Sequence, residues 1–204
     1  SLPPSRPIGG VAGLRHRSLD SGYKFLAGID ASGKTVVWGS PDSKVVRHFK
    51  LKPSPENQIG LAAGVEHLVS LGSDGQVTAW GPESDPACQV NDNWRYEQIA
   101  AGGSYTVLVR KDGVPMFLGP DADKQDWERK LENGIHARGR VLEGAERWPS
   151  AVFCGPESVS LITRDGRLQT WTRQWADRFS YKIRSGLRDG ACTQRFMVLL
   201  KQNG

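Results

Sequence analysis

The sequence has few of the residues from which metal sites and disulfide frameworks are built. Its 204 residues include only three cysteines and four histidines. Cys88, Cys154 and Cys192 show no C-x-x-C spacing and cannot all pair with one another, so a zinc ribbon and a closed disulfide framework are both unexpected. The histidines are scattered, with no H-E-x-x-H pattern. We therefore expect no metal ion and no other cofactor.

Long hydrophobic runs and common catalytic motifs are missing as well. The apolar runs fall far short of the roughly 18 residues that cross a bilayer, and the Pro-rich start, residues 1–7, lacks the apolar core of a secretion signal. We expect a soluble protein, either intracellular or secreted after signal removal, with no membrane partner. There is no G-x-x-x-x-G-K-[ST] phosphate loop and no G-x-S-x-G nucleophile elbow. These absences predict a protein that is not an enzyme.

Glycine, by contrast, is abundant, with 24 residues, and it recurs at fixed spacing. A first glycine is followed eleven residues later by a second one in four copies: Gly22/Gly33, Gly64/Gly75, Gly102/Gly113 and Gly155/Gly166. A fifth copy runs from Thr193 to Gly204. The residue before each second glycine is Ser, Asp or Asn, and such dipeptides are typical of tight hairpin turns with positive φ. The pattern predicts five β-hairpins.

Apolar segments flank each turn, so each copy predicts at least three antiparallel strands. The strand after the turn ends in Trp38, Trp80 or Trp171 in three copies and in Leu118 in a fourth. Because a leucine can replace the indole at this position, these residues are expected to pack between sheets. Successive turn glycines lie 42, 38, 53 and 38 residues apart, which indicates a repeat near 38 residues with one insertion.

Repeats of this kind bury both faces of each sheet only by packing against their neighbours, so we expect an all-β fold: a five-bladed β-propeller of antiparallel blades in a single domain, residues 1–204. The predicted blades lie near residues 15–39, 57–81, 95–119, 147–172 and 183–204. Residues 8–14 are expected to complete the last blade as an N-terminal strand that closes the ring. A fragment of a larger propeller is the alternative. Residues 121–134 are predicted to form a short helical insertion.

Two of the copies, residues 61–81 and the segment that begins with Ile99-Ala100-Ala101-Gly102-Gly103, resemble the repeat of the regulator of chromosome condensation superfamily. This resemblance implies a β-propeller that binds proteins. Within that superfamily the implied roles are nucleotide exchange on a small GTPase, chromatin contact, or inhibition of β-lactamases by compact bacterial relatives. The usual eukaryotic members have seven blades with longer repeats, whereas this chain has five short copies.

A second segment, Asp92-Asn93-Trp94 followed by Ile99 and Gly102-Gly103, resembles the sugar-binding segment of tachylectin-type five-bladed lectins. That resemblance implies a carbohydrate site at Asp92, Asn93 and Trp94. The triplet occurs once in this chain, whereas those lectins repeat it in every blade.

Four tryptophans fall outside the repeat positions, and an indole outside the core often marks a recognition surface. They are Trp94, Trp127, Trp148 and Trp175. The net charge of +5 is concentrated in residues 138–204, which hold 12 Lys and Arg against 6 Asp and Glu. Within that region the candidate binding cations are Arg173, Arg178, Lys182 and Arg184, which are interleaved with aromatic residues and could contact nucleic acid.

The sequence thus predicts a non-catalytic binding module that presents loops to a macromolecular partner, most simply a protein. A carbohydrate-binding lectin is the alternative, and nucleotide exchange on a small GTPase or nucleic-acid binding is a weaker one. His67 takes the repeat position of Phe25 and Tyr105, so we expect a half-buried structural residue there rather than a ligand or a base. The identity of the partner, the compartment and the oligomeric state do not follow from the sequence.

Overall fold

The computed structural model describes residues 19–90, 93–120, 149–163, 166, 168–172, 186–192, 197–201 and 203. Fourteen strands in these ranges form five small antiparallel sheets. Sheet 1 contains β1 (Leu19–Gly22), β2 (Phe25–Ile29) and β3 (Thr35–Gly39). Sheet 2 contains β4 (Gln58–Ala63), β5 (Leu68–Gly72) and β6 (Val77–Trp80), and sheet 3 contains β7 (Tyr96–Ala101), β8 (Thr106–Arg110) and β9 (Pro115–Leu118). Sheet 4 contains β10 (Pro149–Gly155), β11 (Ser158–Thr163) and β12 (Leu168–Thr172), and sheet 5 contains β13 (Leu187–Cys192) and β14 (Met197–Lys201).

The predicted turn glycines adopt the conformation that their dipeptides indicate. Gly33, Gly75, Gly113 and Gly166 have φ of +80°, +85°, +81° and +75°, a region that a residue with a Cβ rarely occupies. In each turn the amide of the glycine donates to the carbonyl three residues earlier, at 2.8 to 3.0 Å. The hairpin prediction is therefore confirmed at these four positions, while Gly204 lies outside the described residues.

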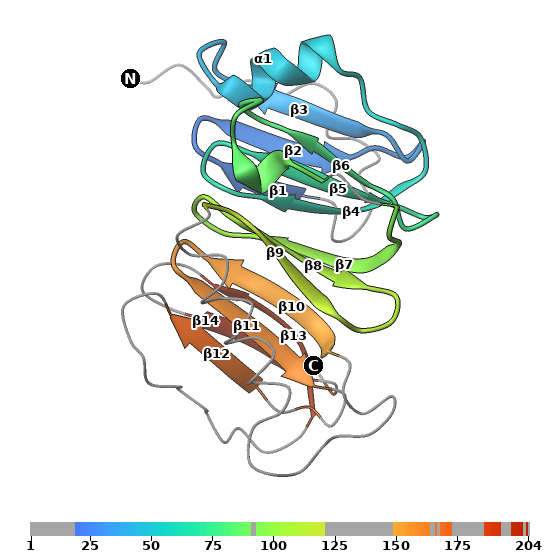
Figure 1. The fold of residues 1–204 in the computed structure, drawn as a ribbon, viewed down its shortest axis with the longest axis vertical. Helices are drawn as coiled ribbons and strands as arrows, with labels where there is room; N and C mark the ends of the chain where they lie inside the picture. The colour runs from blue at the N-terminus through green and yellow to red at the C-terminus, as the bar shows by residue number, and fades with distance from the viewer. Residues whose placement is uncertain are drawn as a thin grey trace, which may run out of the picture.

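Each sheet contacts the next one in chain order, and Figure 1 shows sheets 1 and 2 on one side of sheet 3 and sheets 4 and 5 on the other. The first strands β1, β4, β7, β10 and β13 form the main contacts between one sheet and the next. In Figure 1, sheet 1 lies in the upper half of the molecule and sheet 5 in the lower half, where it overlaps sheet 4. The described residues thus form a series of propeller-like sheets, and closure into a five-bladed ring by residues 8–14 lies outside them and stays a prediction. The helical insertion predicted at residues 121–134 also lies outside the described residues.

Backbone hydrogen bonds join neighbouring sheets at both ends of their strands. At the end that carries the four turn glycines, here called the turn-glycine end, the Gln58 amide donates to Gly33 O at 2.7 Å and the Tyr96 amide donates to Gly75 O at 2.8 Å. At the opposite end a series of bonds links four sheets in turn. The amides of Tyr23, Val65 and Gly103 donate to the carbonyls of Val65, Gly103 and Pro156, at 2.8, 2.9 and 3.1 Å.

The junction between sheets 3 and 4 uses side chains in addition to the backbone bond between Gly103 and Pro156. At the turn-glycine end, the first residues of sheets 2 and 3, Gln58 and Tyr96, each donate a backbone amide to the preceding sheet. Pro149, the first residue of sheet 4, has no N–H and cannot form the equivalent bond. Gln98 Nε2 instead donates to Pro149 O at 2.8 Å. The buried Tyr105 hydroxyl lies 2.7 Å from both Gly155 O and Ser158 O. Two side chains of sheet 3 thus bond to carbonyls of sheet 4.

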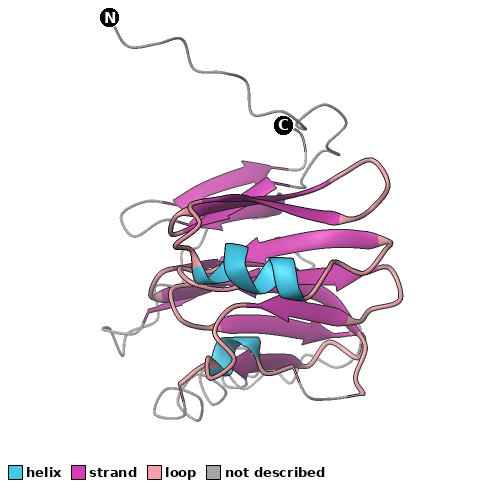
Figure 2. Cartoon of the chain, turned by 90° about the horizontal axis from the view of Figure 1, so that it is seen from above, coloured by secondary structure: helices cyan, strands magenta, loops and turns pink. Residues whose placement is uncertain are grey.

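A helix that the repeat pattern did not predict lies between sheets 1 and 2. Helix α1 (Lys44–Leu51) begins at Ser43, whose side chain accepts a hydrogen bond from the Val46 amide as an N-cap. The helix contacts β3 and β6, and Figure 2 shows it over the strands when the molecule is viewed from above. Its length accounts for part of the first repeat interval of 42 residues, which is longer than the 38 residues of the next. A short 3-10 helix, η1 (Pro86–Cys88), follows β6.

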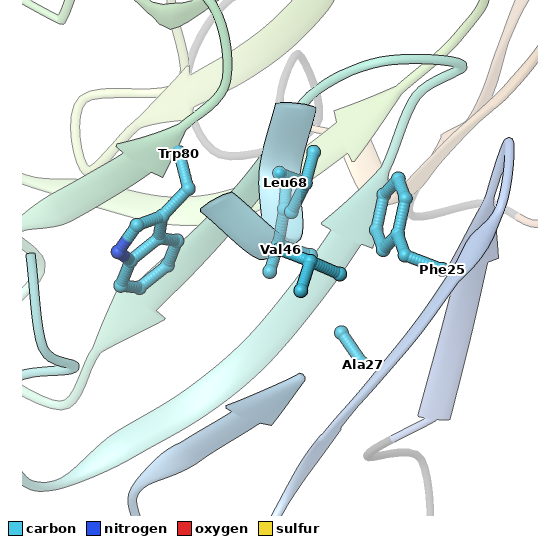
Figure 3. Close-up of a cluster of buried hydrophobic side chains, with 6 residues drawn as sticks. Phe25, Ala27, Val46, Leu68 and Trp80 are labelled. Atoms are coloured by element: carbon cyan, nitrogen blue, oxygen red, sulfur yellow. The ribbon is translucent and has the colours of Figure 1, made fainter. Parts of the chain in front are cut away.

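The core beneath α1 is an apolar cluster that joins sheet 1 to sheet 2. Phe25 and Ala27 from β2, Leu68 from β5 and Trp80 from β6 are buried there with Val46 of the helix (Figure 3). Trp80 is fully buried, its ring centroid lies 5.4 Å from that of Phe49, and its Nε1 donates to Lys52 O at 2.7 Å. The predicted packing role of this repeat tryptophan is confirmed in sheet 2.

Candidate functional site

Two of the predicted binding residues, Asn93 and Trp94, lie in the part of the chain that the structure describes. Both are exposed on the segment that leads into β7. The remaining predicted residues fall outside the described ranges: Asp92, Trp127, Trp148, Arg173, Trp175, Arg178, Lys182 and Arg184. The structure therefore does not bring the predicted residues together as a set, and the site that can be built from it centres on Trp94.

The Trp94 indole is held in place although it is exposed. Its side chain is 49% accessible to solvent, and the Arg110 guanidinium carbon lies 3.3 Å from the centroid of the ring. A guanidinium at this position is attracted to the face of the aromatic ring. Arg110 is itself paired with Asp112 across the hairpin turn between β8 and β9. The ring is thus positioned by a charged network rather than left to move freely.

Local backbone bonds explain why these two segments meet. The Lys111 amide donates to Arg95 O at 2.9 Å, which ties the start of sheet 3 to its own hairpin turn. A Cβ added at Gly75 would lie 3.1 Å from Lys111 Cε and 3.2 Å from Arg95 Cβ, so the turn of sheet 2 packs against both residues. The position of Trp94 therefore follows from the junction between sheets 2 and 3 at the turn-glycine end.

The surface around the indole is cationic and partly apolar. Arg95 and Lys111 are exposed, and neither forms an ion pair with any residue in the described ranges. Val114, in the same hairpin turn, is 44% exposed. We call Trp94, Arg95, Arg110, Lys111 and Val114 the Trp94 corner.

Sequence reasoning found one of these five residues. Arg95 could have been found because it directly follows Trp94. Arg110 gives no comparable signal, because the contact between residues 94 and 110 depends on the register of β7 with β8 and on the path of the preceding loop. Trp94 itself was found because it does not fall at the repeat position of Trp80.

His67 is fully buried, whereas the sequence predicted a half-buried side chain. Complete burial supports the predicted structural role of this residue. Thr106 Oγ1 lies 3.0 Å from both Ala87 O and His67 Nε2, so the imidazole ring shares a buried hydrogen bond with the Thr106 hydroxyl. Burial lowers the pKa of His67 below its ordinary value of 6.5, and the nearby charge of Asp85 opposes that shift in part.

Replacing His67 by Phe is expected to weaken the dependence of stability on pH below about pH 6.5. The folded protein keeps the ring neutral, whereas the unfolded chain binds a proton as the pH falls through 6.5, the ordinary pKa. The free energy of unfolding should therefore fall with decreasing pH, with a slope of up to about 1.4 kcal/mol per pH unit from this one group. Phenylalanine suits the position because Phe25 occupies it in sheet 1.

The measurement is urea unfolding of the wild type and His67→Phe at pH values from about 7.5 to 5. Equal slopes for the two proteins would contradict the assignment of His67 as a buried neutral ring.

The buried thiols are not activated as nucleophiles. Burial, helped by the charge of Asp85, raises the pKa of Cys88 to about 12. Burial also raises the pKa of the Cys154 thiol and of the Tyr105 hydroxyl. Among the described residues there is no group of three or more His, Cys, Asp or Glu side chains that could hold a metal ion. Within those residues, no helix is both long and apolar enough to cross a membrane.

No family model and no curated protein sequence matches the chain. Solved structures do. Human WBSCR16 is 14% identical with a TM-score of 0.69, and the match covers 96% of this chain and 60% of that one. The CRINKLY WD40 ectodomain of the Arabidopsis thaliana receptor kinase ACR4 is 17% identical with a TM-score of 0.62, covering 96% and 62%. Prp20p of Saccharomyces cerevisiae, the yeast RCC1, is 15% identical with a TM-score of 0.63, covering 94% and 57%.

The chain therefore spans about three fifths of the length of the solved structures that it matches. At these identities the likeness concerns the fold alone. The repeated three-stranded sheets, the hydrogen bonds between successive sheets and these likenesses together show that the chain has a β-propeller fold similar to that of yeast RCC1.

Proposed function

We propose that the chain is a non-catalytic β-propeller binding module whose partner is a protein. One observation carries this proposal: an indole that is 49% exposed is held at the turn-glycine end by Arg110. Tryptophan and arginine are enriched among the residues that dominate the energy of protein interfaces. A side chain that is already fixed loses little conformational entropy on binding, which favours its use as an anchor.

The surroundings of Trp94 support a protein partner. Val114 adds exposed apolar surface, and Arg95 and Lys111 add cations that no described residue neutralises. An apolar centre with a polar rim is the usual composition of a protein interface. The solved structure of Prp20p was described together with its binding to Gsp1p and histones, which are proteins. This supports protein binding as a use of the fold, while fold likeness does not transfer a partner.

A lectin is the second candidate, because Asn93 and Trp94 are adjacent and both exposed. An amide and an indole together could bind a sugar ring by a hydrogen bond and by stacking. Only one such pair occurs in the described residues. The backbone carbonyl of Asn93, not its side-chain amide, accepts a hydrogen bond from Arg95 Nη1 at 3.4 Å. The cationic cluster proposed for nucleic acid lies outside the described residues, so that alternative rests on the sequence.

Trp94→Ala is expected to reduce partner capture at least about tenfold and to leave the fold intact. The reason is that Trp94 contributes exposed surface and few buried contacts, so its removal should change the free energy of unfolding by no more than about 1 kcal/mol. The measurement is quantitative mass spectrometry of proteins captured from a lysate of the source organism, with thermal unfolding of each variant. Leu51→Ala is the matched control, because Leu51 is 83% exposed on helix α1.

A glycan array run with the same variants separates the two candidates. Saturable binding to a defined sugar that Trp94→Ala abolishes would overturn the protein-partner proposal in favour of a lectin. Equal capture of every protein by the wild type and Trp94→Ala would overturn the assignment of the site.

A further inference from the structure

The first strands of four sheets share a β-bulge at the same register position. Pairing with the second strand skips one residue between Gln58 and Gly60, between Tyr96 and Gln98, between Pro149 and Ala151, and between Leu187 and Asp189. The skipped residues are Ile59, Glu97, Ser150 and Arg188, which we call the bulge row. A bulge leaves one residue outside the ladder and redirects its side chain.

Every residue of the bulge row is exposed, whereas the residue before each one is buried. Ile59 is 61% exposed, which is high for a large apolar side chain. The bulge therefore repeats as a fixed element of the scaffold and presents one side chain per sheet. The chemistry of that side chain changes from sheet to sheet, in the order apolar, acidic, neutral and basic.

The four residues form a continuous series because the strands that carry them lie against one another in order. They also lie at the turn-glycine end, since Gln58 and Tyr96, the residues just before Ile59 and Glu97, donate their amides to Gly33 and Gly75. This is the end that carries Trp94, and Glu97 stands three residues after it on the same segment. The bulge row and the Trp94 corner are thus parts of one end of the molecule.

The two charged members of the row are available to a partner. Neither Glu97 nor Arg188 forms an ion pair with a residue that the structure describes. The Ser150 hydroxyl, in contrast, lies 3.0 Å from Ile162 O and 3.2 Å from Thr163 O, so it is engaged within sheet 4. The available chemistry is therefore one apolar side chain on sheet 2, one carboxylate on the adjacent sheet 3 and one guanidinium on sheet 5.

We propose that the bulge row is a docking surface for an extended polypeptide segment of complementary order, with an apolar residue at Ile59, a basic residue at Glu97 and an acidic residue at Arg188. This proposal rests on the proposed function as a protein-binding module. Opposite charges at fixed separation select both the sequence and the direction of a bound segment. A polyanion such as nucleic acid fits less well, because Glu97 would repel its phosphates.

The test begins with peptides selected from a random library on the immobilised full chain, whose affinities are then measured by fluorescence anisotropy. Glu97→Lys and Arg188→Glu are each expected to weaken the selected peptides about tenfold or more. The controls are Glu83→Lys and Arg47→Glu, which change the net charge equally at exposed positions outside the row and should leave affinity unchanged. A peptide with its basic and acidic residues exchanged should recover binding to the double variant E97K/R188E.

Three results would overturn the proposal. If both charge-reversal variants bind the peptides as the wild type does while Trp94→Ala does not, the bulge row is not the docking surface and the Trp94 corner remains the site. If no peptide is selected, or if Trp94→Ala and the charge reversals all leave binding unchanged, both proposals fail. If a single-stranded oligonucleotide binds more tightly to Glu97→Lys and less tightly to Arg188→Glu, the ligand is a polyanion rather than a peptide.

Discussion

Trp80→Ala is expected to lower the free energy of unfolding by about 3–5 kcal/mol, the range for removing a large buried aromatic side chain. Trp80 is fully buried, packs against Phe49 at a centroid distance of 5.4 Å and donates its Nε1 proton to Lys52 O. Its loss would open a cavity in the cluster that joins sheets 1 and 2 to helix α1. It would also leave the Lys52 carbonyl without this donor.

Chemical unfolding monitored by circular dichroism measures the effect. Trp80→Phe separates the contribution of apolar packing from that of the hydrogen bond, because it keeps most of the apolar contact and removes the donor. We expect this variant to lower the free energy of unfolding by about 1–3 kcal/mol. Trp94→Ala is the matched control for removal of an indole, since Trp94 is exposed. If Trp80→Ala and Trp94→Ala lower the free energy of unfolding equally, the distinction between a packing tryptophan and a surface tryptophan is wrong.

Gly64→Ala is expected to destabilise the protein by about 1–3 kcal/mol or more, because the space at this position is already filled. A Cβ there would overlap Cε1 and Nδ1 of the buried His67 ring and would lie 2.6 Å from Gly102 O of the next sheet. The carbonyl belongs to the backbone, so it cannot turn aside as an exposed side chain would. Sheets 2 and 3 would have to separate.

Gly60→Ala provides a control on β4, the strand that ends one residue before Gly64. Its added Cβ would meet only Leu71 Cβ at 3.6 Å, an ordinary van der Waals contact. We expect Gly60→Ala to change stability by less than about 1 kcal/mol, with thermal unfolding as the measurement. Similar destabilisation by both substitutions would show that the loss of a glycine in this segment, rather than the contact with sheet 3, determines the change in stability.

The repeat glycines explain why so much of the fold could be predicted from the sequence. The turn glycines need positive φ and the preceding Ser or Asp tolerates the turn, so the hairpins can be identified from local chemistry alone. Gly64 and Gly22 recur for another reason, because the backbone of the neighbouring sheet lies too close to allow a Cβ. Their regular spacing in the sequence was therefore an indirect sign of the contact between sheets. Helix α1 was missed because its N-cap, Ser43, lies in an interval that the repeat pattern treated as a loop.

The candidate site was less predictable, because its parts meet through register. Trp94 could be recognised as an indole outside the repeat, but the stack with Arg110 depends on how β7 pairs with β8. The bulge row has no sequence signature of its own, since Ile59, Glu97, Ser150 and Arg188 share no side-chain chemistry. A bulge depends on how two strands pair, so it cannot be predicted from the sequence of either strand by itself.

Because Pro149 lacks an N–H, the junction between sheets 3 and 4 is held by different hydrogen bonds from those between sheets 1, 2 and 3. Where sheets 1, 2 and 3 meet, backbone amides link them at both ends, and most substitutions leave such bonds in place. Where sheet 3 meets sheet 4, one backbone bond, from the Gly103 amide to Pro156 O, remains, and the other bonds come from the side chains of Gln98 and Tyr105, so much of the coupling there depends on which residues occupy two positions. Where each sheet contacts only its neighbours, the weakest coupling between two sheets influences whether the chain unfolds as one unit or as two. Divergence at these two positions could therefore divide the series into separate unfolding units without changing its architecture.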